Sequence, residues 1–144
     1  AQTKIGESFV VFGAGGVGLN VIQGAALSSA FPIIAIDLYD NRLELAKRMG
    51  ATHVFNSGKC DVRKKILNIL GETGADIVVD NTGNTKVIKL AYEVTQAKGK
   101  TILVGVPRKG DDLSIYSLPL HFGKQIIGSH GGETQPSKDN EHAL

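Results

Sequence analysis

The run Gly13-Ala14-Gly15-Gly16-Val17-Gly18 constrains the fold more than any other feature of this 144-residue chain. It follows an apolar stretch at residues 9–12 and opens a segment whose apolar residues have helical spacing. A second apolar stretch, residues 33–36, ends in Asp37. A glycine loop between a strand and a helix, with an acidic residue at the end of the next strand, is the dinucleotide-binding fingerprint.

Each residue of this fingerprint has a structural role. Gly13 permits a tight turn, Gly15 lets a pyrophosphate approach the backbone, and Gly18 lets the helix lie close to the strand. The helix N-terminus offers free N–H groups and the positive end of a dipole to phosphates. Asp37 can accept hydrogen bonds from both hydroxyls of an adenosine ribose. The plainer alternative is that the glycines only make a turn and Asp37 only caps the next helix.

Strands and helices alternate along the rest of the chain. The pattern predicts strands at 8–12, 33–37, 53–56, 76–80, 101–104 and 125–129, helices at 16–29, 40–49, 61–70 and about 87–94, and a short turn or helix at 118–122. Such alternation requires right-handed crossovers and a parallel sheet covered on both faces. We therefore predict one α/β domain over residues 1–144, a doubly wound six-stranded Rossmann fold with strand order 3-2-1-4-5-6.

In this fold a ligand lies beyond the carboxyl ends of the strands, where the strand order reverses. Five strand ends border this predicted ligand site. One ends at Asp37, and the other four contain glycine, at residues 13–17, 81–83, 104–107 and 129–132. Glycine leaves backbone rather than side chains facing the cleft. These ends together predict a floor on which a cofactor lies across the sheet.

Composition excludes other classes of protein. The net charge is +2, with 42% hydrophobic and 21% charged residues, so nothing indicates a nucleic-acid or membrane surface. No apolar run reaches membrane-span length, and residues 1–4 are not a signal peptide. The single cysteine, Cys60, suits a reducing compartment, and we predict a cytoplasmic protein. The histidines at 53, 121, 130 and 142 lack zinc-ligand spacing, so we predict neither a metal site nor a catalytic residue here.

Several stretches together resemble the coenzyme domain of the medium-chain, zinc-type alcohol dehydrogenases. The resemblance covers about residues 4–139 and is specific through the combination of its motifs. They are residues 6–19, Ile36-Asp37, Arg42-Leu43, Ala46-Lys47, Gly50-Ala51-Thr52, Asp80-Asn81-Thr82-Gly83, residues 103–107 and Gly128-Ser129-His130-Gly131-Gly132.

The resemblance implies that NAD is the cofactor and that particular residues hold its adenosine half. The backbone N–H groups of Gly16 and Val17 would bind the pyrophosphate, and Thr82 and Gly83 would lie beside the adenosine ribose. Arg42 matches a basic position that reaches the same ribose or a nearby phosphate. Because Asp37 would repel a 2′-phosphate and Arg42 lies further along the helix, we expect NAD to be preferred over NADP.

The same resemblance assigns the nicotinamide half. Val104 would present its backbone carbonyl to the carboxamide, and Val106 would pack against the ring. Ser129 and Gly131 would complete the carboxamide contacts through their backbones. His130 sits in the same region, where a hydrogen-bonded structural histidine is the plainer interpretation.

In this family the catalytic zinc and most of the pocket for a small alcohol or carbonyl substrate belong to a separate catalytic domain. The chain is therefore expected to be a cofactor domain from a larger enzyme, binding NAD(H) without turnover. Similar enzymes join two such domains near the sixth strand, whose apolar edge here has little protection. Because residues 113–122 are also apolar, we predict a homodimer through residues 113–129, unless that segment packs on its own sheet.

Two other classes of protein remain. A non-catalytic NAD-sensing regulatory module would also need the glycine loop and the acidic residue, but not the later glycine-bearing strand ends. A methyltransferase also places an acidic residue after its second strand, and it would bind S-adenosylmethionine instead of NAD.

Overall fold

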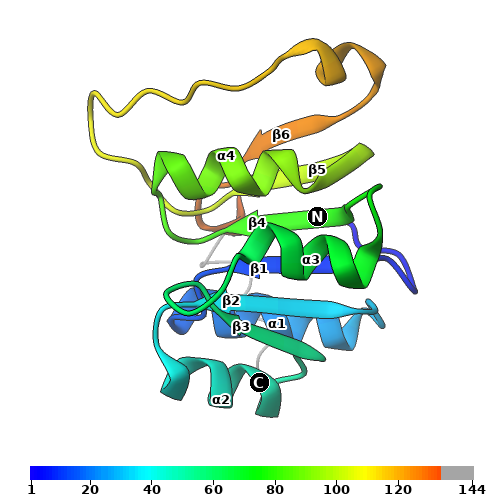
Figure 1. The fold of residues 1–144 in the computed structure, drawn as a ribbon, viewed down its shortest axis with the longest axis vertical. Coiled ribbons are helices and arrows are strands. Elements are labelled where there is room, and N and C mark those ends of the chain that lie inside the picture. Colours follow the sequence, from blue (N-terminus) through cyan, green and yellow to red (C-terminus); the bar gives the residue numbers. More distant parts are fainter. Residues whose placement is uncertain (134–144) are drawn as a thin grey trace.

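The computed structural model describes residues 1–133, and its strands form one parallel sheet in the order β3-β2-β1-β4-β5-β6 (Figure 1). This order confirms the predicted doubly wound fold. The elements are β1 (Phe9–Phe12), α1 (Gly16–Leu27), β2 (Ile33–Asp37), α2 (Asp40–Arg48), β3 (His53–Asn56), α3 (Val62–Leu70), β4 (Ala75–Asp80), α4 (Thr85–Glu93), β5 (Thr95–Leu103), the 3₁₀ turn η1 (Leu118–Phe122), β6 (Gln125–Gly128) and η2 (Gly131–Glu133). Residues 134–144, including His142 and the end of the predicted family resemblance, lie outside this range.

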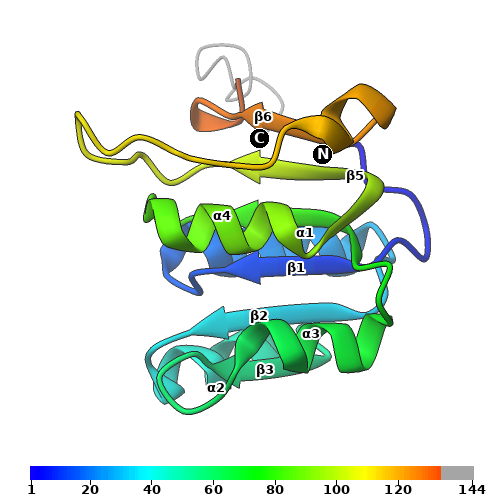
Figure 2. The same cartoon turned by 45° about the horizontal axis from the view of Figure 1, so that its top comes forward.

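The central strand β1 is buried on both faces and separates two apolar layers. Phe9 and Val11 pack in the layer that contains α1 residues and Ala46 of α2. Val10 and Phe12 point to the other face, where α3 and α4 cover the sheet. Figures 1 and 2 show α3 and α4 on one side of the sheet and α1 on the other. The continuous apolar strands of the sequence therefore reflect burial on both faces.

Two of the helices, α3 and α4, follow residues whose side chains satisfy free backbone donors. The side chain of Asp61 accepts a hydrogen bond from the Lys64 N–H at the start of α3, and Asn84 accepts one from the Lys86 N–H at the start of α4. The helix α1 starts at Gly16, within the glycine-rich run at residues 13–18, and ends at Leu27, two residues before the predicted end. The N-termini of α1 and α4 both follow carboxyl ends of strands, β1 and β4.

The strand β5 differs from prediction, because it begins at Thr95 rather than near residue 101. Its pairing with β4 shifts register between Ala75, which faces Thr95, and Ile77, which faces Lys100. A Cβ at Gly99 would lie 2.8 Å from the carbonyl oxygen of Ala75, so the bulge needs a glycine there. The apolar pattern did not predict this extension, because residues 98–100 are two lysines and a glycine.

The connection from β5 to β6 crosses beside α4 before it reaches η1 (Figures 1 and 2). The Tyr92 hydroxyl on α4 donates a 2.8 Å hydrogen bond to the Tyr116 carbonyl, and the Lys124 Nζ lies 4.3 Å from the Tyr92 ring centroid. The strand β6 forms the edge of the sheet, and Ile127 on it is 43% exposed. Within residues 1–133, the helices are all too short or too polar to cross a bilayer.

Candidate cofactor site

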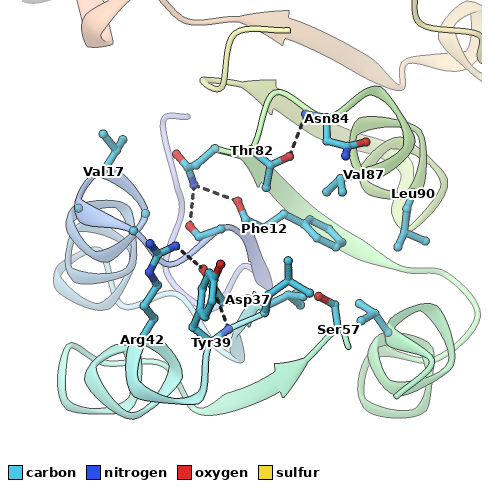
Figure 3. Close-up of a pocket in the computed structure, with 18 residues that line it drawn as sticks. Phe12, Val17, Asp37, Tyr39, Arg42, Ser57, Thr82, Asn84, Val87 and Leu90 are labelled. Atoms are coloured by element: carbon cyan, nitrogen blue, oxygen red, sulfur yellow. Dashed lines mark hydrogen bonds and ion pairs between the residues drawn. The ribbon is translucent and has the colours of Figure 1, made fainter. Parts of the chain in front are cut away.

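A cavity of about 550 Å³ opens where the strand order reverses, beyond the carboxyl ends of β1, β2 and β4 (Figure 3). This volume is within the usual range for sites that hold small ligands. The predicted site residues that line it are Gly13, Gly15, Gly16, Val17, Gly18, Asp37, Arg42 and Thr82. The structure therefore gathers the glycine loop, the acidic residue and the basic residue in one place.

The glycines of the loop divide into two that are tightly packed and two that face open space. Gly13 turns at a φ of +88°, and a Cβ at Gly18 would lie 1.8 Å from the Gly13 carbonyl oxygen. By contrast, a Cβ at Gly15 or Gly16 would meet nothing within 4 Å. Gly13 and Gly18 therefore shape the loop, while Gly15 and Gly16 leave backbone bare beside the cavity, as a bound pyrophosphate requires.

Asp37 serves the loop as well as the cavity. Its side chain is 5% exposed, and Oδ2 accepts a 2.8 Å hydrogen bond from the Ala14 N–H while Oδ1 accepts one of 3.0 Å from the Tyr39 N–H. An ionised carboxylate has about four acceptor sites, so capacity for a ligand hydroxyl remains. The sequence predicted the acidic residue but not its bond to the loop, which depends on how close β2 lies to β1.

Arg42 lies beside Asp37, closer than its position along α2 suggested. Its Nη1 is 3.6 Å from Oδ2 of Asp37, and its guanidinium carbon lies 4.8 Å from the centroid of the Tyr39 ring. Figure 3 shows the three side chains together at one wall of the cavity. The arrangement places a cation and an exposed aromatic ring next to the predicted ribose acceptor.

The remaining walls include residues that the sequence reasoning assigned elsewhere or missed. Val62, Val87 and Leu90 lie within the predicted helices at 61–70 and about 87–94, and they line the cavity between α3 and α4. Asn81 donates through Nδ2 to the carbonyls of Phe12 and Gly13 at 3.3 and 3.4 Å, which ties the end of β4 to the glycine loop. Its Oδ1 is buried with no hydrogen-bond partner among the described residues. Only its place at a strand end signalled Asn81 in the sequence.

The other predicted site residues lie outside this cavity. Gly83 and Val106 line a neighbouring cavity of about 440 Å³, and Val104 and Ser129 line one of about 500 Å³ on the α1 side of the sheet. The Ser129 N–H donates to the Leu103 carbonyl at 2.8 Å, so this donor is already used in the sheet. Gly131 begins η2, at a φ of +56°. Across residues 1–133, no three histidine, cysteine, aspartate or glutamate side chains gather as a metal site.

Comparison with known protein families identifies the family of this chain. Residues 16–144 match the family described as zinc-binding dehydrogenase. The chain belongs to this family. The predicted resemblance to zinc-type alcohol dehydrogenases is thereby confirmed.

Individual relatives agree with this assignment. The S-(hydroxymethyl)glutathione dehydrogenase of Paracoccus denitrificans is 37% identical over 96% of this chain and 39% of its own length. The D-xylulose reductase of Saccharomyces cerevisiae is 34% identical over 83% of this chain and 35% of its own. The chain thus spans well under half the length of the curated relatives it matches.

Solved structures show the same fold. Benzyl alcohol dehydrogenase from Acinetobacter calcoaceticus superimposes with a TM-score of 0.88 at 36% identity, over 95% of this chain and 38% of that one. A zinc-binding dehydrogenase from Sinorhizobium meliloti, solved bound to NADP, has a TM-score of 0.83 at 26% identity over 90% of this chain and 39% of its own.

Proposed function

We propose that this chain is the NAD(H)-binding domain of a zinc-type alcohol or polyol dehydrogenase. It would hold the nicotinamide for hydride transfer to or from a small alcohol or carbonyl substrate. The observation that carries this proposal is the bare backbone at Gly15 and Gly16, which lines a cavity whose wall also contains Asp37. Relatives named alcohol dehydrogenase class-3, D-xylulose reductase and benzyl alcohol dehydrogenase support the reaction class.

The pyrophosphate would bind at the start of α1. The hydrogen bonds of α1 begin with the Leu19 N–H, which donates to the Gly15 carbonyl. The N–H groups of Gly16 and Val17 come before this bond and have no carbonyl within the helix to which they could donate. Donors at a helix N-terminus, with the positive end of the dipole, attract anions by about 0.3–1 kcal/mol per charge at an exposed site. The backbone would therefore neutralise part of the diphosphate charge without a basic side chain.

The adenosine would occupy the part of the cavity between α2, α3 and α4. The ribose hydroxyls would reach the free acceptor capacity of Asp37, with Thr82 opposite. The apolar side chains of Val62, Val87 and Leu90 offer a surface against which the flat faces of a purine ring can pack. All of the residues proposed for this half of the site lie within residues 1–133 and line the main cavity.

The nicotinamide half would lie toward the ends of β5 and β6. Val104, Val106, Ser129 and Gly131 belong to that side, outside the main cavity. When bound, the cofactor supplies the hydride acceptor or donor, and this chain positions it. The catalytic zinc and the substrate pocket would come from the part of the relatives' length that this chain does not span.

Two assembly features complete the proposal. A homodimer would form through residues 113–129, since β6 is an edge strand and Tyr116, Leu118 and Phe122, in the segment that precedes it, are exposed. The enzyme would work in the cytoplasm, where Cys60, a free cysteine in the structure, stays reduced.

Isothermal calorimetry on the isolated chain tests the binding function. NAD⁺ should bind one to one, NADP⁺ more weakly, and S-adenosylmethionine not measurably. The chain should form no NADH from alcohols, with or without added zinc. Tighter binding of S-adenosylmethionine would select the methyltransferase alternative, and absence of NAD⁺ binding would reject the proposed function.

A further inference from the structure

We propose that Asp80 is a positioning residue that holds the two loops after β4 and β5 together as one unit beside the cofactor. Asp80 is the last residue of β4 and has 0% exposure. It is therefore not a ligand contact itself. This inference rests on the proposed function, because NADH affinity is one of its readouts.

The carboxylate of Asp80 holds the loop after β4. Its Oδ1 accepts hydrogen bonds from the Thr82 N–H at 3.2 Å and the Thr82 Oγ1 at 2.6 Å, and its Oδ2 accepts one from the Gly83 N–H at 2.9 Å. No ion pair of Asp80 occurs within residues 1–133. A buried carboxylate without a cation is costly, and these three hydrogen bonds from uncharged donors offset part of that cost.

The main chain of the same residue holds the loop after β5. The Asp80 carbonyl oxygen accepts the N–H groups of both Val104 and Gly105, each at 2.9 Å. One residue thus bonds the first loop through its side chain and the second loop through its backbone. Any movement of the end of β4 would shift both loops together.

The two loops also touch backbone to backbone. A Cβ at Gly83 would lie 2.4 Å from the Val106 carbonyl oxygen, and a Cβ at Gly105 would lie 2.2 Å from the Gly83 nitrogen. Thr82 lines the cofactor cavity, and Val106 lies on the predicted nicotinamide side. This contact joins the two halves of the proposed cofactor site directly, and Asp80 bonds both of the loops that make it.

Asp76 provides a matched comparison at the opposite end of the same strand. Its Oδ2 accepts from the N–H of Ser8 at 2.8 Å and from Ser8 Oγ at 2.6 Å, and its Oδ1 accepts from the side-chain amide of Gln96. The number of accepted bonds equals that of Asp80. Its neighbours, however, lie at the amino ends of the strands, away from the cavity.

The experiment compares Asp80→Asn with Asp76→Asn. An amide nitrogen cannot accept a hydrogen bond, so Asp80→Asn loses at least one bond from the loop after β4. In Asp76→Asn the Gln96 amide can turn to keep its bond, but the bonds lose the carboxylate charge, so both variants should melt at a lower temperature. Asp80→Asn alone should weaken NADH binding, by about tenfold, the factor expected for about 1.4 kcal/mol. Its affinity for ADP should fall less, because ADP does not reach the loop after β5. Equal NADH affinity in both variants would overturn the positioning role.

A second pair of variants keeps the test valid if Asp80→Asn does not fold. Thr82→Val removes the hydroxyl donor to Asp80, and Thr82→Ser keeps it. Amide hydrogen exchange at Gly83 and Gly105 should accelerate in the valine variant and stay near wild type in the serine variant. This readout needs no cofactor, so it tests the coupling even if the wild type fails to bind NADH and the proposed function falls. Unchanged exchange in Thr82→Val would reject the coupling.

Discussion

Nη1 of Arg42 lies 3.6 Å from Oδ2 of Asp37, so the acidic residue at the proposed ribose site has a cation beside it. At such a distance opposite charges attract by about 1–4 kcal/mol near a protein surface. The cation offsets part of the repulsion that Asp37 exerts on a 2′-phosphate. The preference for NAD should therefore be smaller than Asp37 alone would produce.

Arg42→Ala should sharpen the preference for NAD. We expect NADP⁺ affinity to fall by up to about fivefold, while NAD⁺ affinity changes less than about twofold, in line with a partly exposed ion pair of up to about 1 kcal/mol. Calorimetric titration of both cofactors measures the ratio, and Arg42→Lys serves as the control that keeps the charge. A fall in NAD⁺ affinity equal to that for NADP⁺ would contradict this role.

Gly15→Val and Gly18→Val should separate binding from folding. A side chain at Gly15 enters open space, so that variant should keep its circular dichroism and melting temperature but lose NAD⁺ binding. At Gly18 even a Cβ would overlap the Gly13 carbonyl oxygen, so that variant should lose several kcal/mol of stability. Unchanged NAD⁺ affinity in a folded Gly15→Val protein would mean that the loop serves only as a turn.

Much of the fold could be predicted because β1, β2 and β4 are apolar through their middles, and glycine or proline lies next to one end of each. Asp37 and the glycine loop were recognisable for the same reason, since each stands directly after such a strand. The extension of β5 over residues 95–100 could not be predicted, because it depends on a bulge at Gly99 rather than on an apolar pattern.

The sequence also could not predict that the candidate site residues are divided among separate cavities. Strand ends show which residues share one edge of the sheet, but not how its surface divides into cavities. Thus Thr82 lines the main cavity while Gly83, the next residue, turns against Val106. The proximity of Arg42 to Asp37 depends on its side-chain conformation across the start of α2, which residue spacing does not specify.

Lys124 should make stability depend on alkaline pH. Burial lowers the pKa of its ammonium below the ordinary 10.5, although the charge of Glu93 opposes this. Above the folded pKa the unfolded chain binds more protons, so wild-type stability should rise relative to Lys124→Met as pH approaches 10.5.

Urea unfolding of both proteins at pH 7.5 and pH 10 measures this difference. Tyr92, whose pKa burial raises, is present in both proteins. Lys98→Met, at an exposed position, is the control and should show the same difference at both pH values. A wild-type advantage over Lys124→Met that shrinks at pH 10 would contradict the predicted sign.

Phe122→Lys should weaken the proposed homodimer. Phe122 suits this test better than Ile115 in the same segment, because Phe122 is 70% exposed whereas Ile115 is half-buried beside α4. Substitution of Phe122 should therefore disturb the fold of the protomer less. Light scattering should report about twice 15.2 kDa for the wild type and a lower mass for the variant. Leu27→Lys, at an 88% exposed site on α1, is the control and should remain dimeric. A wild type that stays monomeric at high concentration would reject the interface.

The central claim is that the glycine loop and Asp37 hold a dinucleotide, and amide NMR of the isotopically labelled chain during NAD⁺ titration tests it most directly. We predict saturable shifts of the amides of Gly15, Gly16 and Val17, with Tyr39 and Thr82 shifting at the same ligand concentrations. Saturable shifts confined to residues outside this cavity, or no shifts at millimolar NAD⁺, would contradict the claim.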